Sequence, residues 1–217
     1  MVKQSTSELR WIRPPQQARS QETLERILDA AEALVVEKGF EDTPIAEIVH
    51  RAGSSVGAFY TRFEDKDALL HALYQRYYEQ ALATADDALD PARWQGRGVG
   101  VIVASVTRFL VSVYRDHAPM IRAFIVRTHL DAGFQAKHER LYLDVSQRLS
   151  ALLLARREEI GHPQPERAIA FGLTLVFGGL ERALIFGDAR PSPFVLDDDD
   201  LATELTRSLL AYLGTPA

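Results

Sequence analysis

Apolar side chains recur every three or four residues along most of the chain, the spacing that places them on one face of an α-helix. Gly39 followed by Phe40 is typical of a left-handed helix end, and Ser20 can cap the helix before it. These signals predict a first helix between Ser20 and Gly39. Its apolar face consists of Leu24, Ile27, Leu28, Ala31, Leu34 and Val35.

Two short helices are predicted next. Thr43 can cap a helix that has Pro44 at its first position and ends at Gly53, and Ser55 can cap a third helix that reaches Phe63. The buried face of the second helix consists of Ile45, Ile48, Val49 and Ala52. Two short helices around a tight glycine turn indicate a helix-turn-helix, whose second helix enters the major groove of DNA. A two-helix corner without any role in DNA binding fits this spacing equally well.

The remaining apolar periodicity is also helical. Predicted helices run from Lys66 towards Pro91 and then over about 99–117, 120–130, 134–160, 166–186 and 199–213, separated by glycine and proline. No strand pattern is visible, so the fold class is all-α. A chain of 217 residues has room for a small domain and a larger one.

Composition excludes several classes of protein. With 47% hydrophobic and 25% charged residues the chain is ordinary for a globular protein, and its lack of cysteine excludes disulfides, thiolate metal sites and a cysteine nucleophile. No apolar run approaches the roughly 18 residues of a membrane span. The first residues lack the apolar stretch of a secretory signal. We therefore expect a cytoplasmic protein without a membrane segment.

The net charge of −5 argues at first against a nucleic-acid partner, because Lys and Arg carry phosphate binding. The charge is unevenly distributed, however: residues 1–21 contain Lys3, Arg10, Arg13 and Arg19 against Glu8 alone. Residues 1–19 are therefore predicted to form a basic N-terminal arm. Such an arm either grips DNA or is a solvated tail, and its charge alone does not decide between the two.

A longer motif runs through the same region in fixed register. It consists of Ile27 to Ala31, Glu37 to Phe40, Thr43, Ile45, Ala46, Ala52, Gly53, Ser55, Gly57, Phe59, Tyr60, Phe63, Lys66 and Leu69. This motif closely resembles the N-terminal domain of the TetR family of repressors. The resemblance implies a helix-turn-helix DNA-binding domain over residues 20–66 and a C-terminal helical domain over 67–217 that binds an effector and dimerises. Beyond about residue 75 the resemblance is only architectural.

The resemblance also implies which side chains meet DNA. The hydroxyl of Tyr60 and the ammonium of Lys66 should bind phosphates, and Thr43 with Ser55 should place hydroxyls near the DNA backbone. Val56 and Ala58 can contact thymine methyl groups, and Thr61 can hydrogen-bond a base edge. The full set of expected contacts is Arg19, Thr43, Ser54, Ser55, Val56, Gly57, Ala58, Tyr60, Thr61, Arg62 and Lys66.

Some of these residues carry a physical signature of their own. Gly57 weakens a helix by about 1 kcal/mol, a cost that close approach to DNA would justify. Lys66 in a first helical turn opposes the helix dipole and suits an anion, although a solvated lysine is the plain alternative. Two residues depart from the family pattern: Ser54 replaces a small apolar residue, and Arg62 stands where histidine is frequent. Arg62 can read guanine or hold a phosphate, so the base preference stays open.

The family further implies a homodimer through the helices near 166–186 and 199–213. Gly172, Gly178 and Gly179 suit close helix approach there, or local kinks within one chain. Two recognition helices have to reach half-sites about 34–36 Å apart, or a multiple of that distance. The expected partners are therefore double-stranded operator DNA, a second copy of the chain and a small-molecule effector.

A ligand pocket is expected among the middle helices, where aromatic side chains gather, although such a stripe is more often plain core. The candidate lining residues are Phe109, Tyr114, Phe124, Arg127, Tyr142, Phe171 and Phe177. The histidines show no metal-ligand spacing, so neither a metal nor another cofactor is expected besides the unidentified effector.

The chain is interpreted as a transcriptional regulator. A repressor that leaves a palindromic operator when its effector binds is the mode that the resemblance implies. No nucleophile motif, phosphate-cradling loop or carboxylate pair supports an enzyme. The alternative is a helical small-molecule-binding or interaction protein without operator binding.

Overall fold

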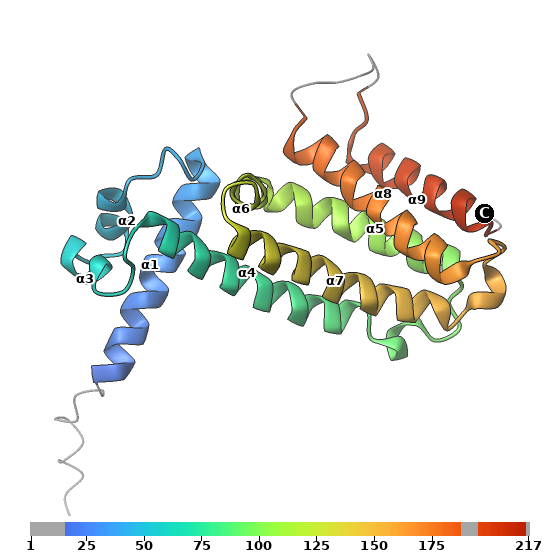
Figure 1. The fold of residues 1–217 in the computed structure, drawn as a ribbon, viewed down its shortest axis with the longest axis horizontal. Coiled ribbons are helices and arrows are strands. Elements are labelled where there is room, and N and C mark those ends of the chain that lie inside the picture. The colour runs from blue at the N-terminus through green and yellow to red at the C-terminus, as the bar shows by residue number, and fades with distance from the viewer. Residues whose placement is uncertain (1–15, 188–194, 216–217) are drawn as a thin grey trace, which may run out of the picture.

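The computed structural model describes residues 16–187 and 195–215, with side chains from residue 20 onward, and every regular element in this part of the chain is helical. Figure 1 shows an elongated molecule with α1, α2 and α3 gathered at one end, and α4 running from there beneath the remaining helices. The all-α prediction is confirmed. The elements are α1 (Gln16–Lys38), α2 (Ile45–Arg51), α3 (Val56–Tyr60), α4 (Lys66–Ala88), η2 (Pro91–Trp94), α5 (Val99–Asp116), α6 (Ala118–Thr128), α7 (Ala132–Leu154), η3 (Arg157–Glu159), α8 (Pro165–Leu180), the π-helical turn η4 (Glu181–Ile185) and α9 (Asp198–Leu213).

Local signals set the ends of the first three helices. Gly39 and Gly53 take positive φ angles of 85° and 58°, a conformation in which only glycine avoids a steric penalty, and the chain turns at each of them. The hydroxyl of Ser55 accepts a hydrogen bond from the Ala58 amide at 3.1 Å, which caps α3. These three predictions are confirmed. The third helix is shorter than expected and ends at Tyr60.

Two predicted helix caps are wrong. Helix α1 begins at Gln16, so Ser20 lies inside the helix and does not cap it. Thr43 is wholly buried, and its hydroxyl donates to the carbonyl of Gly39 at 2.7 Å instead of capping α2. The carbonyl of Pro44 starts the α2 ladder, because it accepts from the amide of Ile48. Thr43 thus closes the turn after α1.

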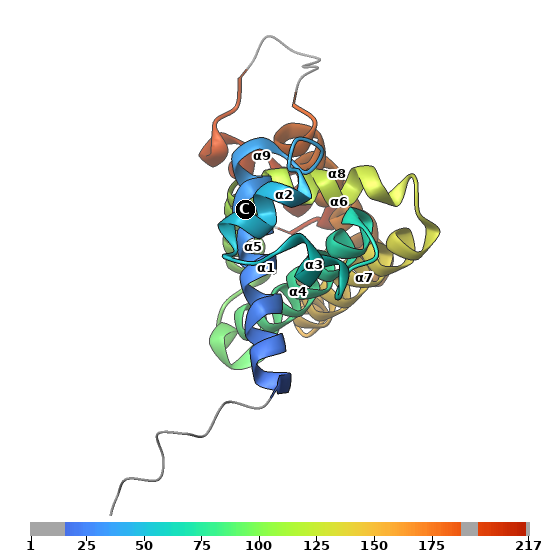
Figure 2. The ribbon, with the colours of Figure 1, turned by 90° about the vertical axis from the view of Figure 1, so that its left-hand side faces the viewer.

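Two hydrophobic cores organise the chain. The N-terminal core joins α1, α2, α3 and the start of α4 to four side chains of α6 and α7: Met120, Phe124, Phe134 and Leu141. The C-terminal core joins the end of α4 to α5, α7, α8 and α9. Seen from the α1–α3 end, the helices of this second core lie behind the first (Figure 2). Helix α4 contributes to both cores, so packing continues across residue 66. The domain boundary expected at this residue therefore stays a prediction.

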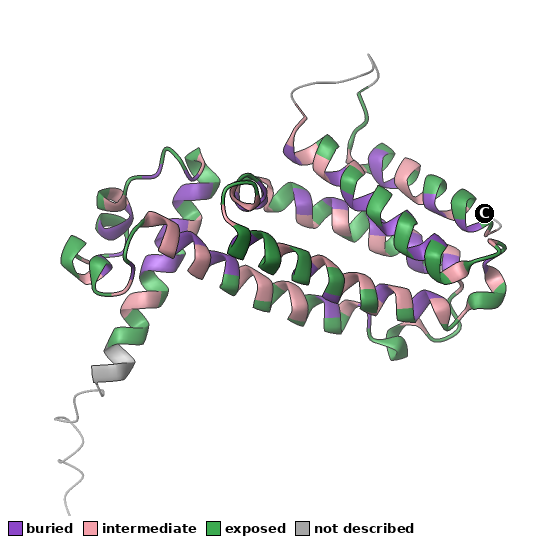
Figure 3. Ribbon diagram, viewed as in Figure 1, coloured by how far each residue is buried: buried purple, intermediate pink, exposed green. Residues whose placement is uncertain are grey.

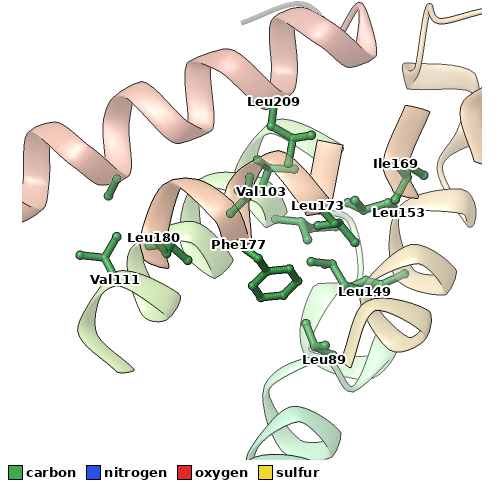
Figure 4. Close-up of a cluster of buried hydrophobic side chains, with 14 of the residues drawn as sticks. Leu89, Val103, Val111, Leu149, Leu153, Ile169, Leu173, Phe177, Leu180 and Leu209 are labelled. Atoms are coloured by element: carbon green, nitrogen blue, oxygen red, sulfur yellow. The ribbon is translucent and has the colours of Figure 1, made fainter. Parts of the chain in front are cut away.

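The C-terminal core is a helical bundle that α8 and α9 complete. Leucine and valine side chains of α5, α7, α8 and α9 point towards one another around Phe177 (Figure 4). A Cβ atom on Gly172 would overlap Leu209, and one on Gly179 would lie 2.8 Å from Leu205. Two of the three singled-out glycines therefore let α8 approach α9 within one chain. A Cβ on Gly178 would meet nothing.

The later helices follow the predicted breaks with shifted ends. Pro119 lies in the first turn of α6, which begins at Ala118, and α7 ends at Leu154, earlier than expected. The helix predicted near 166–186 is α8 extended by the π-helical turn. Within the described residues, Pro165–Ile185 is long and apolar enough to span a membrane by length and composition, with 44% of its most apolar window buried. Core helices pass the same test, so the expected lack of a membrane segment stays a prediction.

Candidate functional site

The outward face of α3 collects most of the residues expected to meet DNA. Ser55, Val56, Gly57, Tyr60 and Thr61 are exposed, as Figure 3 shows for this end of the molecule. The same helix is anchored from within, because Phe59 is fully buried and its ring lies 5.1 Å from that of Phe63. A short helix is thus held by one face while the other remains open.

Gly57 lies in the middle of this face. A Cβ atom at this position would meet only the hydroxyl oxygen of Ser55, at 3.9 Å, so the chain itself gives no steric reason for glycine here. The Ser55 oxygen accepts from the Ala58 amide, which leaves its hydrogen for another acceptor. Val56 and Tyr60 lie next to Gly57 on this face and expose 47% and 55% of their surface.

Arg62 and Lys66 are occupied within the chain. The Arg62 guanidinium donates to the carbonyls of Ala58 at 2.7 Å and of Ser20 at 3.2 Å, and also to the Ser20 hydroxyl, so it ties α3 to α1. Lys66 donates to the carbonyl of Glu41 at 3.1 Å and lies over the Phe40 ring. Partial burial lowers the pKa of Lys66. Neither side chain is simply directed towards solvent.

Other cations of the helix-turn-helix are also paired. Lys38 bonds to Glu47, and Arg51 makes a two-pronged pair with Glu37 at 2.6 and 2.9 Å. Of the remaining predicted contacts, Ser54 and Ala58 are half-buried. The buried hydroxyl of Thr43 has no surface from which to reach a phosphate, which corrects its expected role. Arg19 belongs to α1, but its side chain is outside the described residues, as is the arm over residues 1–15.

A cavity of about 480 Å³ lies among α4, α5, α6, α7 and α8. It opens between α4 and α5, where Gln80, Thr84, Ser105 and Phe109 are the exposed lining residues. The volume is typical of small-molecule sites, which are mostly apolar with a few placed polar groups. The cavity therefore has room for one small organic molecule.

Five of the seven predicted lining residues line this cavity: Phe109, Tyr114, Phe124, Tyr142 and Phe177. Two predictions are wrong. Arg127 pairs with Asp67 of α4 beside the helix-turn-helix, and Phe171 is half-exposed on the outer face of α8.

The sequence reasoning missed other lining residues. Tyr77 lies on the apolar face of α4 and could have been found by extending that face, whereas Trp94 comes from the irregular stretch after α4 and gave no periodic signal. His117 and His138 also line the cavity. Among the described residues, no group of three or more His, Cys, Asp or Glu could hold a metal.

The inner end of the cavity is polar. The Tyr142 hydroxyl donates to a carboxylate oxygen of Glu181 and lies 2.6 Å from the Tyr114 hydroxyl. Burial, together with the nearby Glu181 charge, raises the pKa of both tyrosines, and burial raises that of Tyr77 to about 12. Burial lowers the pKa of His138. These groups are therefore neutral near pH 7.

Four structural links connect the cavity end of the molecule with the helix-turn-helix. Helix α4 begins at Lys66 beside α3 and lines the cavity further along. Phe124 of α6 lines the cavity and also belongs to the N-terminal core. Arg127 of α6 pairs with Asp67, and His71 of α4 bonds to Asp131 before α7 at 2.9 Å. A displacement of the cavity wall can therefore be transmitted through these contacts to α4 and the N-terminal core.

Comparison with known proteins gives relatives for both halves of the chain. Residues 27–73 match the model of the bacterial regulatory proteins of the tetR family. YvdT of Bacillus subtilis (strain 168), an uncharacterized HTH-type transcriptional regulator, is 38% identical over 27% of this chain and 30% of its own length. YdeS of the same organism, with the same description, is 26% identical over 82% of this chain and 87% of its own length.

A solved structure extends the comparison to the whole fold. A TetR transcription regulator from Haloarcula marismortui ATCC 43049 superposes with a TM-score of 0.68 at 18% identity, covering 89% of this chain and 97% of that one. At such identity the similarity concerns the fold, including the helical C-terminal region.

Proposed function

We propose that this chain, whose residues 27–73 match the model of the tetR family of bacterial regulatory proteins, is a dimeric repressor that leaves a palindromic operator when a small molecule fills the cavity. The observation that carries the proposal is the outward face of α3, where exposed side chains surround a glycine that the chain's own packing does not require. A surface of this kind, on a helix anchored by Phe59, is suited to the major groove.

On this face, each exposed group has a role towards DNA. The Tyr60 hydroxyl and the free hydrogen of Ser55 bind phosphates, while Val56 contacts a thymine methyl and Gly57 allows the backbone to come close. Thr61 donates its hydrogen to the Gly57 carbonyl at 2.8 Å, so its oxygen acts towards DNA as an acceptor. Arg62 and Lys66 act mainly by holding α3 and α4 in place.

The basic arm supplies positive charge for DNA binding. The described helix-turn-helix offers little such charge, because most of its own cations are paired within the chain. Lys38, Arg51, Arg62 and Lys66 all have acidic or carbonyl partners. An excess of positive charge lies in residues 1–19 of the sequence, which hold Lys3, Arg10, Arg13 and Arg19. We therefore assign the arm to DNA rather than to solvent, and expect it to contribute most of the salt dependence of binding.

Helices α8 and α9 form the dimer contact. Their outward face is apolar: Phe171 and Leu175 are 50% and 53% exposed, with Tyr212 of α9 beside Phe171 at a ring distance of 5.4 Å. Exposed Gly178 on the same face permits close approach of a second helix. Covering this face with its own copy removes it from water and also explains the high apolarity of Pro165–Ile185.

Release from DNA follows from the shared helices. A molecule in the cavity pushes on Phe124 of α6 and on Tyr77 of α4, both of which line it. Because α6 packs in the N-terminal core and α4 begins at the helix-turn-helix, the two α3 helices of the dimer change separation. Ligand and operator affinities are then reciprocally coupled.

The experiment that tests operator binding is selection of bound genomic fragments by the purified chain at stated salt, followed by footprinting. A palindrome with half-sites about one turn of DNA apart is expected. In the Tyr60→Phe variant, binding should weaken on all sequences, because a phosphate contact is lost. Tyr78→Phe, which removes a hydroxyl bonded to Asp144 away from α3, is the matched control. No enrichment over bulk DNA, or equal binding by both variants, would contradict the proposal.

A further inference from the structure

The described residues that line the cavity carry no formal charge. Among the described residues that line it, none is Lys, Arg, Asp or Glu, and most are apolar or aromatic. Burial against such walls stabilises any apolar molecule of suitable size. Selectivity therefore depends on the few polar groups and on whether each donates or accepts hydrogen bonds.

Hydrogen bonds at the inner end have a fixed direction. A tyrosine hydroxyl has one hydrogen, and Tyr142 gives it to Glu181. In the 2.6 Å bond between the two tyrosines, Tyr114 is therefore the donor. With its hydrogen used in this way, Tyr114 offers only lone pairs to a molecule in the cavity.

His117 presents an acceptor as well. Its Nδ1 atom lies 3.1 Å from the carbonyl of Val113, which can only accept, so Nδ1 carries the hydrogen. In the neutral ring, Nε2 is then an acceptor. His117 and Tyr114, three residues apart in the chain, both line the cavity, so its wall offers two acceptors to a ligand that can donate.

Glu181 adds negative charge behind these acceptors. Its carboxylate is joined to the wall through Tyr142, and no cationic side chain lines the cavity within the described residues. Burial also lowers the pKa of His138, which keeps that ring uncharged. An anion at this end would be desolvated beside a carboxylate, whereas a cation would gain a counter-charge.

We propose that the cavity selects an apolar, aromatic amine in its ammonium form, with the ammonium group donating to Tyr114 and His117 and balanced by Glu181. This ligand class is inferred from the cavity; only its role as the effector rests on the proposed function. Aromatic walls such as Phe177 and Tyr142, whose rings lie 4.8 Å apart, add favourable contact with a cation.

The test is calorimetric titration of the full, DNA-free chain with three biphenyl probes of similar size: 4-phenylbenzylamine, 4-phenylbenzyl alcohol and 4-phenylbenzoate. The amine should bind most tightly, and the carboxylate should bind at least about tenfold more weakly, the ratio expected for a charge-assisted hydrogen bond. Equal affinities, tightest binding of the carboxylate, or no binding of the amine would overturn the inference.

A substitution then tests the counter-charge. Glu181→Gln is isosteric and keeps an oxygen to accept from Tyr142, so the fold, checked by circular dichroism, should persist. Affinity for the amine should fall about tenfold, while that for the alcohol stays within about threefold. Glu166→Gln, an exposed change on α8, should leave both unchanged. An undiminished amine preference in Glu181→Gln would refute the role of Glu181.

Operator binding on the same preparations separates the two proposals. Operator binding without amine preference overturns only the ligand class. Amine preference without operator binding overturns only the proposed regulator.

Discussion

The two ends of the molecule use aromatic side chains in opposite ways. At the helix-turn-helix end, Phe59 is 0% exposed and anchors α3 from beneath. At the cavity end, Tyr114, Tyr142 and Phe109 line an internal space, and Phe109 is 42% exposed at its mouth. The same residue types thus fill one core and leave room in the other. The helix-turn-helix end is thus suited to holding α3 rigidly, whereas the cavity end is suited to accepting a ligand.

The largest effect is expected from truncating the anchor. Phe59→Ala should lower the free energy of unfolding by about 3–5 kcal/mol, because a fully buried ring leaves a cavity in a closed core. Phe109→Ala, at the mouth of an existing cavity, should cost less than about 1 kcal/mol. Urea denaturation at one protein concentration measures both. Equal losses would remove the contrast between the two cores.

The next effect concerns the outer face of the cavity end. Leu175→Glu should raise the dissociation constant of the dimer at least about hundredfold, since two like charges meet in an apolar contact and such juxtapositions cost several kcal/mol. Leu130→Glu, at a leucine that is 73% exposed between α6 and α7, is the control and should leave the dimer intact. Sedimentation equilibrium measures the dissociation constants of both variants. A Leu175→Glu dimer of unchanged affinity would show that this face is not the dimer interface.

The smallest effect tests how α3 is held. Arg62→Lys should destabilise the chain by about 1 kcal/mol, because an ammonium cannot keep the forked bonds to Ala58 and Ser20 at once. Thr61→Ala, next to it and exposed, should change stability by less than about 0.5 kcal/mol. Thermal denaturation is the measurement. Stability unaltered by Arg62→Lys would return that residue to the list of direct DNA contacts.

Sequence reasoning succeeded where short-range chemistry decides. Gly39, Gly53 and Ser55 act through their own backbone or through neighbours a few residues away, and their roles were predicted correctly. Thr43 was misread because the same hydroxyl can cap forwards or bond backwards, and only the packed turn selects Gly39. Capping rules describe the local options but do not choose between them.

The cavity depends on contacts between distant segments, which periodicity does not encode. Phe171 and Phe177 lie on one helix with similar neighbours, yet one faces outward and the other faces the cavity. Arg127 was placed in the pocket by proximity in sequence, whereas its partner Asp67 lies on another helix. The polar relay from Tyr114 through Tyr142 to Glu181 joins three helical segments and left no motif.

Coupling between the two ends is the central claim, and operator affinity measured with and without a saturating cavity ligand tests it most directly. The ligand would be whichever biphenyl probe binds the free chain most tightly. Operator affinity should fall by a factor of about 5–150, and probe affinity should fall by the same factor on the operator-bound protein. Identical probe affinities for free and operator-bound protein would contradict the account.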